Sequence, residues 1–484
     1  MKQDDDKKSP KRPLIKDADH PLRTRRDFLA QGLLTGVGSL ILPFAAKAQI
    51  PGCEMGLTVT ENPMIPVIVI DLAGGGNIAG SNVIVGKAGG QDDYLTDYTT
   101  LGLDASRHPS LPNMVDRELG IAFHRDSAML AGIKATTTAA TRAKMDGLLF
   151  CGSSDDDTDN NPHNPMYWFH KAGARGQITQ LVGNVNSMSG ARSQAPAPSV
   201  DVSVRPARVS SPADVTNMIG IGATADSFMG SRGGSILMQA IDSLSTAHIN
   251  AISRRQMSNE IKDVVLCNSA KTQGVLSKFT TNQVNPMTDT IINTNFNLNA
   301  GGDVRTAGTV TKMVLDGLAA TGTITMGGFD YHSGNRVDGD SKDREVGEII
   351  GRIMQTASMK DTPVVVYIYT DGGVASNNNT DANAQGKLVW AGDSGQRSAS
   401  LMLVFNPAGR PTVRMSSRQV GRYKEGGSVD LNASPMSNSV VNLAKAVVLN
   451  YLALHGQEGN FAEVVDDNPF STSMDSHLFF TRIA

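Results

Sequence analysis

The stretch Val364-Val365-Val366-Tyr367-Ile368-Tyr369 decides the fold, because six β-branched or aromatic residues in a row predict a strand that is buried on both faces. A second run of this kind, Val67-Ile68-Val69-Ile70, follows Pro66. Strands with two buried faces are typical of parallel sheets that are covered by helices. We therefore expect both runs to lie near the centre of one such sheet.

Around these runs, predicted strands alternate with predicted helices. Strands are expected at residues 147–151, 323–326 and 400–405, and helices at 165–172, 235–279, 311–319, 344–357 and 440–454. Alternation of this kind implies crossover connections. The predicted fold class is α/β, with a mainly parallel central sheet and helices on both faces. Residues 184–213 are rich in Ser, Pro and Ala without a clear period, so we expect an excursion over the surface there.

The N-terminal region has the order of an export signal. The sequence TRRDFL at residues 24–29 precedes a weakly apolar run over 33–46, and Ala46-Lys47-Ala48 offers a cleavage site. We expect residues 1–48 to be a twin-arginine signal peptide and residues 49–484 to form a single large domain. A membrane anchor is the alternative, but it needs about 20 apolar residues, and this run is shorter. A lipid anchor on Cys53 is a further alternative.

The charge balance argues against one class of partner. The predicted leader holds ten Lys and Arg against six Asp, a surplus of four, so the remainder carries −3 minus 4, or −7. An acidic protein of this kind is not typical of nucleic-acid binding, and we expect no nucleic acid as partner. The three cysteines, at positions 53, 151 and 267, show no spacing typical of a metal site.

Acidic residues follow three of the predicted strands. Asp71 follows the run at 67–70, Asp330 follows Gly327-Gly328-Phe329, and Asp371 follows Thr370. Ligands of open parallel sheets bind beyond the carboxyl ends of the strands, and His332 lies close to Asp330 in the chain. We therefore expect Asp71, Asp330, His332 and Asp371 to hold a divalent cation such as zinc, manganese or calcium. Each Asp could instead be a turn or helix-capping residue, in which case no cofactor is expected.

Several motifs together resemble a known family. They are the twin-arginine leader, DLAGGGN at residues 71–77, PHNPMY at 162–167, GGFDYH at 327–332 and TDGG at 370–373. In this order they resemble the bacterial family called domain of unknown function 1501, whose fold is similar to that of alkaline phosphatases and sulfatases. The resemblance implies an alkaline phosphatase-like domain and a hydrolase of small anionic esters, with Asp330 and His332 as metal ligands and Asp371 as an acidic ligand.

The chain departs from that family at several positions. Gly372 stands where a histidine is common, and Gly392-Asp393-Ser394-Gly395 stands where the family often shows Gly-x-Asp-His-Gly. Two imidazoles are therefore missing. Asn77 replaces an acidic or hydroxyl residue, and Ser81 is the nearby hydroxyl that could act as catalytic nucleophile.

Two functions remain open from the sequence. The first is a metal-dependent phosphate or sulfate ester hydrolase, which would act on a small anionic ester. The second is a catalytically degenerate scaffold or binding protein of the same fold. In both cases the expected location is periplasmic or secreted, the Tat translocase is the expected partner during export, and no membrane span is expected to remain after cleavage.

Overall fold

The computed structural model describes residues 64–154, 160–219, 243 and 281–484. Apart from Ser243, these residues belong to one compact unit, which is built from Met55–Gln239 and Thr272–Ala484. The predicted leader, Cys53, Cys267 and most of the helix expected over 235–279 lie outside the described residues. Among the helices that are described, none combines the length and the apolar character that crossing a membrane requires.

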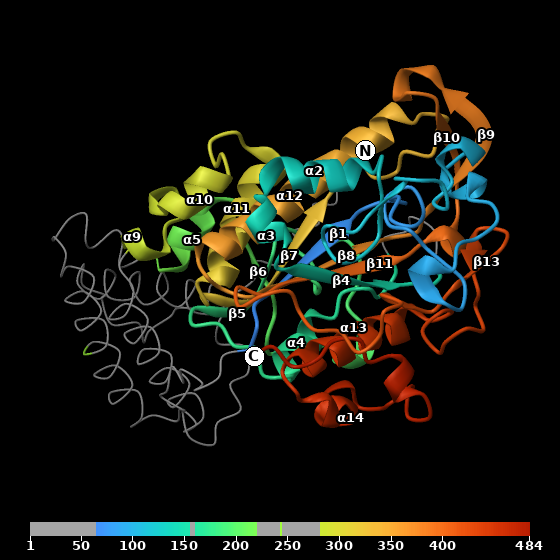
Figure 1. Cartoon of the computed structure of the whole chain (residues 1–484). Coiled ribbons are helices and arrows are strands. Elements are labelled where there is room, and N and C mark those ends of the chain that lie inside the picture. Colours follow the sequence, from blue (N-terminus) through green and yellow to red (C-terminus); the bar gives the residue numbers. More distant parts are fainter. Residues whose placement is uncertain (1–63, 155–159, 220–242, 244–280) are drawn as a thin grey trace, which may run out of the picture. The chain divides into compact units, whose positions relative to one another are not determined.

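The central feature is an eight-stranded sheet in which β1 lies between β7 and β8 and runs parallel to both (Figure 1). The register pairs Asp71 with Thr325 on one side and with Tyr369 on the other. In spatial order the strands are β12 (Gln419–Val420), β4 (Met145–Phe150), β11 (Ser400–Phe405), β8 (Val364–Thr370), β1 (Val67–Leu72), β7 (Ala319–Met326), β5 (Thr179–Gly183) and β6 (Ala207–Arg208).

One strand of this sheet runs against the others. β11 pairs antiparallel with both β8 and β4, whereas the remaining pairs are parallel. The sheet is therefore mixed but mostly parallel, and the predicted α/β fold class is confirmed.

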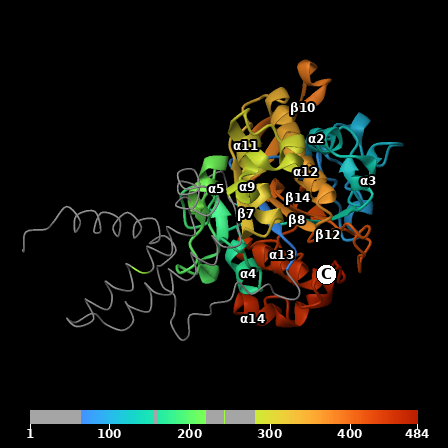
Figure 2. The ribbon, with the colours of Figure 1, turned by 90° about the vertical axis from the view of Figure 1, so that its left-hand side faces the viewer.

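Helices cover both faces of the sheet, as predicted. Because side chains alternate along a strand, Ile68 and Ile70 of β1 enter one hydrophobic core and Val67 and Val69 enter the other. The first core is covered by α2 (Ala128–Thr136), α11 (Gly302–Leu315) and α12 (Val337–Met359), and the second by α4 (Met166–Lys171), α13 (Val440–Leu454) and α14 (Phe461–Val465). Figures 1 and 2 both show α11 and α12 on the side of the sheet opposite α13 and α14.

The helix limits agree with the sequence in part. α13 begins and ends where we expect it, and α12 extends beyond the expected 344–357 at both ends. The limits expected for 311–319 are wrong, because α11 ends at Leu315 and β7 already begins at Ala319. Gly317 lies between them with φ of +68°, a left-handed conformation that ends the helix.

The segment 184–213 contributes to the sheet as well as to the surface. It contains β6, which pairs with β5 at the sheet edge, and it leads into the short helix α5 (Pro212–Met218). Buried Ser193 also belongs to this segment.

After β8 the chain leaves the main sheet and forms an antiparallel arm. The arm consists of β9 (Val374–Asp381) and β10 (Lys387–Asp393), which pair only with each other among the described strands. The remaining short elements are β2 (Val115–Asp116), β3 (Phe123–His124), α3 (Ala139–Arg142), α9 (Thr281–Val284), α10 (Thr290–Asn295), β13 (Tyr423–Lys424) and β14 (Ser428–Val429).

A ring of alternating charges joins three helices. Lys312 of α11 and Lys360 at the end of α12 each bind Asp289, which caps α10, and each also binds Asp316. The Lys360 Nζ distances are 2.8 Å to Asp289 Oδ2 and 2.7 Å to Asp316 Oδ1. All four side chains are largely buried, so solvent screens these pairs weakly.

Candidate functional site

The loops after β1 and β7 lie in close contact at the carboxyl edge of the sheet. Ala73 N donates to Met326 O at 2.9 Å, and Phe329 N donates to Ala73 O at 3.3 Å. Gly74 has φ of +108°, and a Cβ at this position would lie 2.5 Å from Asp330 N. Only glycine fits here, and its absence of a side chain allows the Asp330 loop to pack directly on the loop after β1.

Asp330, His332 and Asp393 converge at this edge. His332 Nε2 lies 2.6 Å from Asp330 Oδ1 and 3.4 Å from Asp393 Oδ2. One potential ligand atom from each residue lies within 4.8 Å of the others. His332 is half-buried and both carboxylates are exposed, so the cluster is open to solvent.

The β9–β10 arm brings Asp393 to this cluster. Asp393 is the last residue of β10 and pairs with Val374, the first residue of β9. Ser394 N then donates to Gly373 O at 2.8 Å, so the base of the arm is fastened to the loop that follows β8. A Cβ on Gly75 would lie 3.5 Å from Asp393 Oδ1, which places this carboxylate against the loop after β1 as well.

The donor set fits a divalent cation. Two carboxylate oxygens and one imidazole nitrogen are ligands that zinc and manganese accept. A set of three protein ligands leaves coordination positions open, as catalytic metal sites require. Asp330 and His332 come from the loop after β7 and Asp393 from the end of β10, and the backbone contacts described above hold both segments at the sheet edge.

Asp71 lies in a different environment. It is fully buried, and its carboxylate accepts hydrogen bonds from Thr325 Oγ1 at 2.9 Å, Ser193 Oγ at 3.0 Å, Arg192 N at 3.0 Å and Ser193 N at 3.3 Å. Burial raises the pKa of Asp71, and these hydrogen bonds oppose the rise. The chain itself therefore supplies four donors to this carboxylate.

Asp371 is also fully buried, and Asn161 Nδ2 donates to its Oδ1. Nearby, His163 stacks on Tyr369 with ring centroids 5.0 Å apart, and its Nε2 lies 2.8 Å from Ser154 Oγ. Burial lowers the pKa of His163 to about 3, so this imidazole is neutral at physiological pH. Of the four ligands expected from the sequence, the cluster thus contains Asp330 and His332, while Asp71 and Asp371 are held in a buried polar region.

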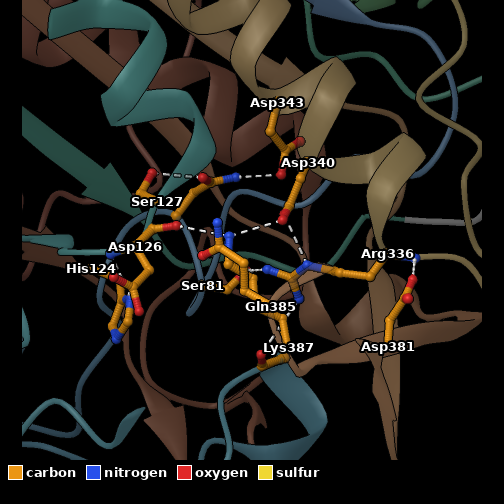
Figure 3. Close-up of polar contacts among 12 residues, drawn as sticks. Ser81, His124, Asp126, Ser127, Arg336, Asp340, Asp343, Asp381, Gln385 and Lys387 are labelled. Carbon is orange, nitrogen blue, oxygen red and sulfur yellow. Dashed lines mark hydrogen bonds and ion pairs between the residues drawn. The ribbon is translucent and has the colours of Figure 1, made fainter. Parts of the chain in front are cut away.

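Ser81 belongs to a third group, a buried network beside the N-terminal end of α12 (Figure 3). Its Oγ accepts from Asn77 Nδ2 at 2.6 Å and from Arg336 Nη2 at 3.1 Å. Arg336 Nε donates to Asp340 Oδ1 at 2.9 Å, and Lys387 Nζ donates to Asp340 Oδ2 at 2.8 Å. Among the described residues, none of these contacts joins Ser81 to the cluster of Asp330, His332 and Asp393.

Sequence reasoning missed Asp393 as a candidate ligand. In the sequence, the turn Gly392-Asp393-Ser394-Gly395 is interpreted only through the histidine that it lacks. In the structure, the carboxylate of Asp393 in this turn faces His332. A signal was present in the sequence, since an Asp-Ser pair flanked by two glycines marks a turn where a carboxylate can project. The polar sequence of the arm gave no indication that this turn returns to the sheet edge.

The sequence matches no family model and no curated protein. Among solved structures, the chain is similar to a protein described as "putative sulfatase yidJ" from Bacteroides fragilis, with 11% identity and a TM-score of 0.20. The match covers 89% of this chain and 80% of that protein. A likeness of this size is too slight to assign a function.

Proposed function

We propose that this protein is a cation-dependent hydrolase of phosphate or sulfate esters, with the cation held by Asp330, His332 and Asp393. The observation that carries the proposal is the convergence of these residues from two chain segments, with one candidate ligand atom of each within 4.8 Å of the others. The exposure of the two carboxylates supports it, because a small ester anion in solution can reach an open site.

The three residues contribute different types of ligand to the proposed cation site. Asp330 and Asp393 supply two negative charges that favour a divalent cation, and His332 supplies a nitrogen ligand between them. A divalent cation bound there would lower the pKa of a water ligand and would stabilise the oxygens of an ester anion. Ser81 remains the nucleophile predicted from the sequence, although its oxygen already accepts two hydrogen bonds in the buried network.

The test is elemental analysis of protein purified from its native host, followed by turnover of aryl phosphate and aryl sulfate esters with and without added zinc or manganese. Asp330→Asn and His332→Ala should lose bound metal and turnover. Asp92→Asn is the matched control, because Asp92 is an exposed carboxylate paired with Arg117 outside the cluster. A metal-free protein without turnover under all conditions would overturn the proposal.

The second candidate function is an inactive scaffold or binding protein of the same fold. The observation that favours it is the environment of Asp71, whose carboxylate accepts hydrogen bonds from Thr325, Ser193 and the backbone of Arg192. In this case Asp71 and Asp371 would stabilise the sheet edge instead of binding a cation. Asp71→Asn would then lower the melting temperature, and wild-type protein loaded with zinc or manganese would turn over neither aryl phosphate nor aryl sulfate esters.

The location and family assignment belong to the proposal as well. The leader and the motifs at residues 71–77, 162–167, 327–332 and 370–373 support export by the twin-arginine pathway and membership of the domain of unknown function 1501 family. Replacement of both Arg25 and Arg26 by Lys should retain the precursor in the cytoplasm, and a cell-fractionation blot measures this. Unchanged export of that variant would contradict the pathway.

A further inference from the structure

Tyr331 stands between the exposed Asp330 and the half-buried His332 yet is itself buried, at 4% exposure. Its hydroxyl donates to Asp343 Oδ1 at 2.7 Å and accepts from Asn77 N at 2.5 Å. The side chain therefore points into the protein while Asp330 and His332 remain at the surface. This alternation fixes which side of the loop presents the two ligands.

Asp343 is the point where several segments meet. It lies in α12 and is 1% exposed, and its Oδ2 accepts from Asn82 Nδ2 at 2.7 Å and from Asn77 Nδ2 at 3.3 Å. Asn82 is oriented in turn, since its Oδ1 accepts from Ser127 Oγ at 2.6 Å at the start of α2. Figure 3 shows the contacts of Ser127 and Asp343 at the upper end of the network. One carboxylate thus connects α12, the loop after β1 and the loop that carries Tyr331.

Packing restricts the Tyr331 loop from two sides. A Cβ on Gly339 of α12 would lie 2.9 Å from Tyr331 Cδ2, and a Cβ on Gly74 would lie 2.5 Å from Asp330 N. The aromatic ring of Tyr331 therefore packs directly on Gly339, and the backbone of Asp330 packs directly on Gly74. The loop cannot shift towards Gly74 or Gly339, because there is no free space on either side. Within this narrow range, the hydrogen bond from the Tyr331 hydroxyl to Asp343 determines the position of the loop.

The same region also holds the arm that carries Asp393. Gly334 N donates to Trp390 O of β10 at 2.7 Å, and the Arg336 guanidinium lies 4.4 Å from the centre of the Trp390 ring. Arg336 is 2% exposed and is fixed by Asp340. The two chain segments that supply the three ligand candidates are therefore joined by direct contacts outside the cluster as well.

We propose that Asp343 and Tyr331 are positioning residues for the cation site: their hydrogen bond holds the 330–332 loop so that Asp330 and His332 face Asp393. This inference rests on the proposed function for the role of the cation, but the effect on the loop is independent of it. Residues behind metal ligands typically change metal affinity by 10- to 100-fold when they are altered.

The experiment compares Tyr331→Phe with Tyr451→Phe in the full chain. Tyr451 is a matched control, because it is fully buried and its hydroxyl donates to Ile65 O at 2.9 Å on the other face of the sheet. Two quantities are measured for each variant and for Asp343→Asn. The first is the dissociation constant for Mn²⁺, and the second is amide hydrogen exchange of Phe329 and Gly334, which report the two ends of the loop.

Tyr331→Phe and Asp343→Asn should weaken Mn²⁺ binding by about tenfold and accelerate exchange at Phe329 and Gly334, whereas Tyr451→Phe should do neither. If exchange in this loop and Mn²⁺ affinity stay at the wild-type level in Tyr331→Phe, the positioning role is wrong. If the wild type binds no Mn²⁺ but loop exchange still rises, the loop-holding role stands and the proposed function fails.

Discussion

His332 Nε2 lies 3.4 Å from Asp393 Oδ2, so the sheet edge and the β9–β10 arm meet through two side chains that are far apart in the sequence. Asp330 approaches the same nitrogen from within the loop of His332. Because Asp393 is the only one of the three that comes from the arm, it decides whether the cluster offers two ligands or three.

Asp393→Asn should therefore weaken Mn²⁺ or Zn²⁺ binding by at least about tenfold, since even residues behind the ligands typically account for that much. The substitution removes a negative charge while it preserves the size of the side chain. Isothermal titration of the two metals measures the effect. Asp92→Asn, which changes an exposed carboxylate elsewhere, should bind as the wild type does. Equal affinities in all three proteins would exclude Asp393 from the site.

Ser81→Ala separates a structural hydroxyl from a nucleophile. Asn77 and Arg336 would lose a buried acceptor, so the free energy of unfolding should fall by about 1–3 kcal/mol, as measured by urea denaturation. Because the contacts of Ser81 lie in the buried network, we expect metal binding to be preserved. Ester turnover then decides its role: a loss of activity in a folded, metal-bound variant would identify Ser81 as the nucleophile.

Asp343 should make stability depend on pH near neutrality. Burial raises the pKa of Asp343 to about 7, from an ordinary value of 3.8, although hydrogen bonds from Tyr331 and Asn82 oppose the rise. Between these two values the folded state holds a proton that the unfolded state releases. The contribution of Asp343 to the free energy of unfolding must therefore fall as pH rises from about 4 to about 7.

Urea denaturation at pH 5 and pH 8 measures this contribution, with Asp343→Asn as the comparison. The stability of the wild type relative to the variant should decrease between the two pH values, because the variant cannot titrate at this position. A difference that stays constant across the range would show that the carboxyl group ionises at its ordinary pKa.

The ring of alternating charges around Asp289 should give stability the opposite pH dependence to that expected from Asp343. Burial alone would raise the pKa of Asp289, but hydrogen bonds from Lys360, the Ile292 amide and Lys312 lower it overall. The stabilisation is thus present above the ordinary pKa near 4 and is lost as pH falls through the lowered value. At pH 7, Asp289→Asn should reduce the free energy of unfolding by about 1.5–3 kcal/mol, because Lys312 and Lys360 each lose one charged partner but keep Asp316.

Thermal denaturation of Asp289→Asn at pH 7 and pH 3 checks this prediction. The difference from the wild type should shrink at the lower pH, because below the ordinary pKa the unfolded wild-type chain binds a proton at Asp289 while the folded ring does not. Lys171→Ala is a suitable control, since the pair of Lys171 with Asp466 is exposed and contributes little. A deficit that does not change with pH would argue for a packing effect.

The sequence predicts the buried elements well and the exposed ones poorly. The apolar runs of β8 and β11 and the helix α13 are recovered almost to the residue, because burial on two faces leaves a continuous apolar pattern. That same pattern carries no information on direction, so the antiparallel orientation of β11 could not be predicted. β9 reads Val-Ala-Ser-Asn-Asn-Asn-Thr-Asp and shows no strand signal, because much of it is exposed.

This difference also explains what the sequence predicts about the site. Asp330 and His332 could be predicted because they follow a buried strand. Asp393 depends on the path of a polar arm, and the partners of Asp71 come from Arg192 and Ser193 in a segment without a regular pattern. Both relationships are tertiary, and no local rule of spacing predicts them.

Asp393 lies at the base of the β9–β10 arm, so an ion bound by the cluster would stabilise the folded conformation of the arm. The stabilisation should increase with the concentration of the ion, because a ligand stabilises the conformation that binds it. Asn378, Asn379 and Thr380 near its tip are exposed and accessible to a broad-specificity protease. The rate of proteolytic cleavage at these residues can be measured by gel electrophoresis at increasing metal concentrations. It would report the metal occupancy of the cluster without a substrate or a chromophore.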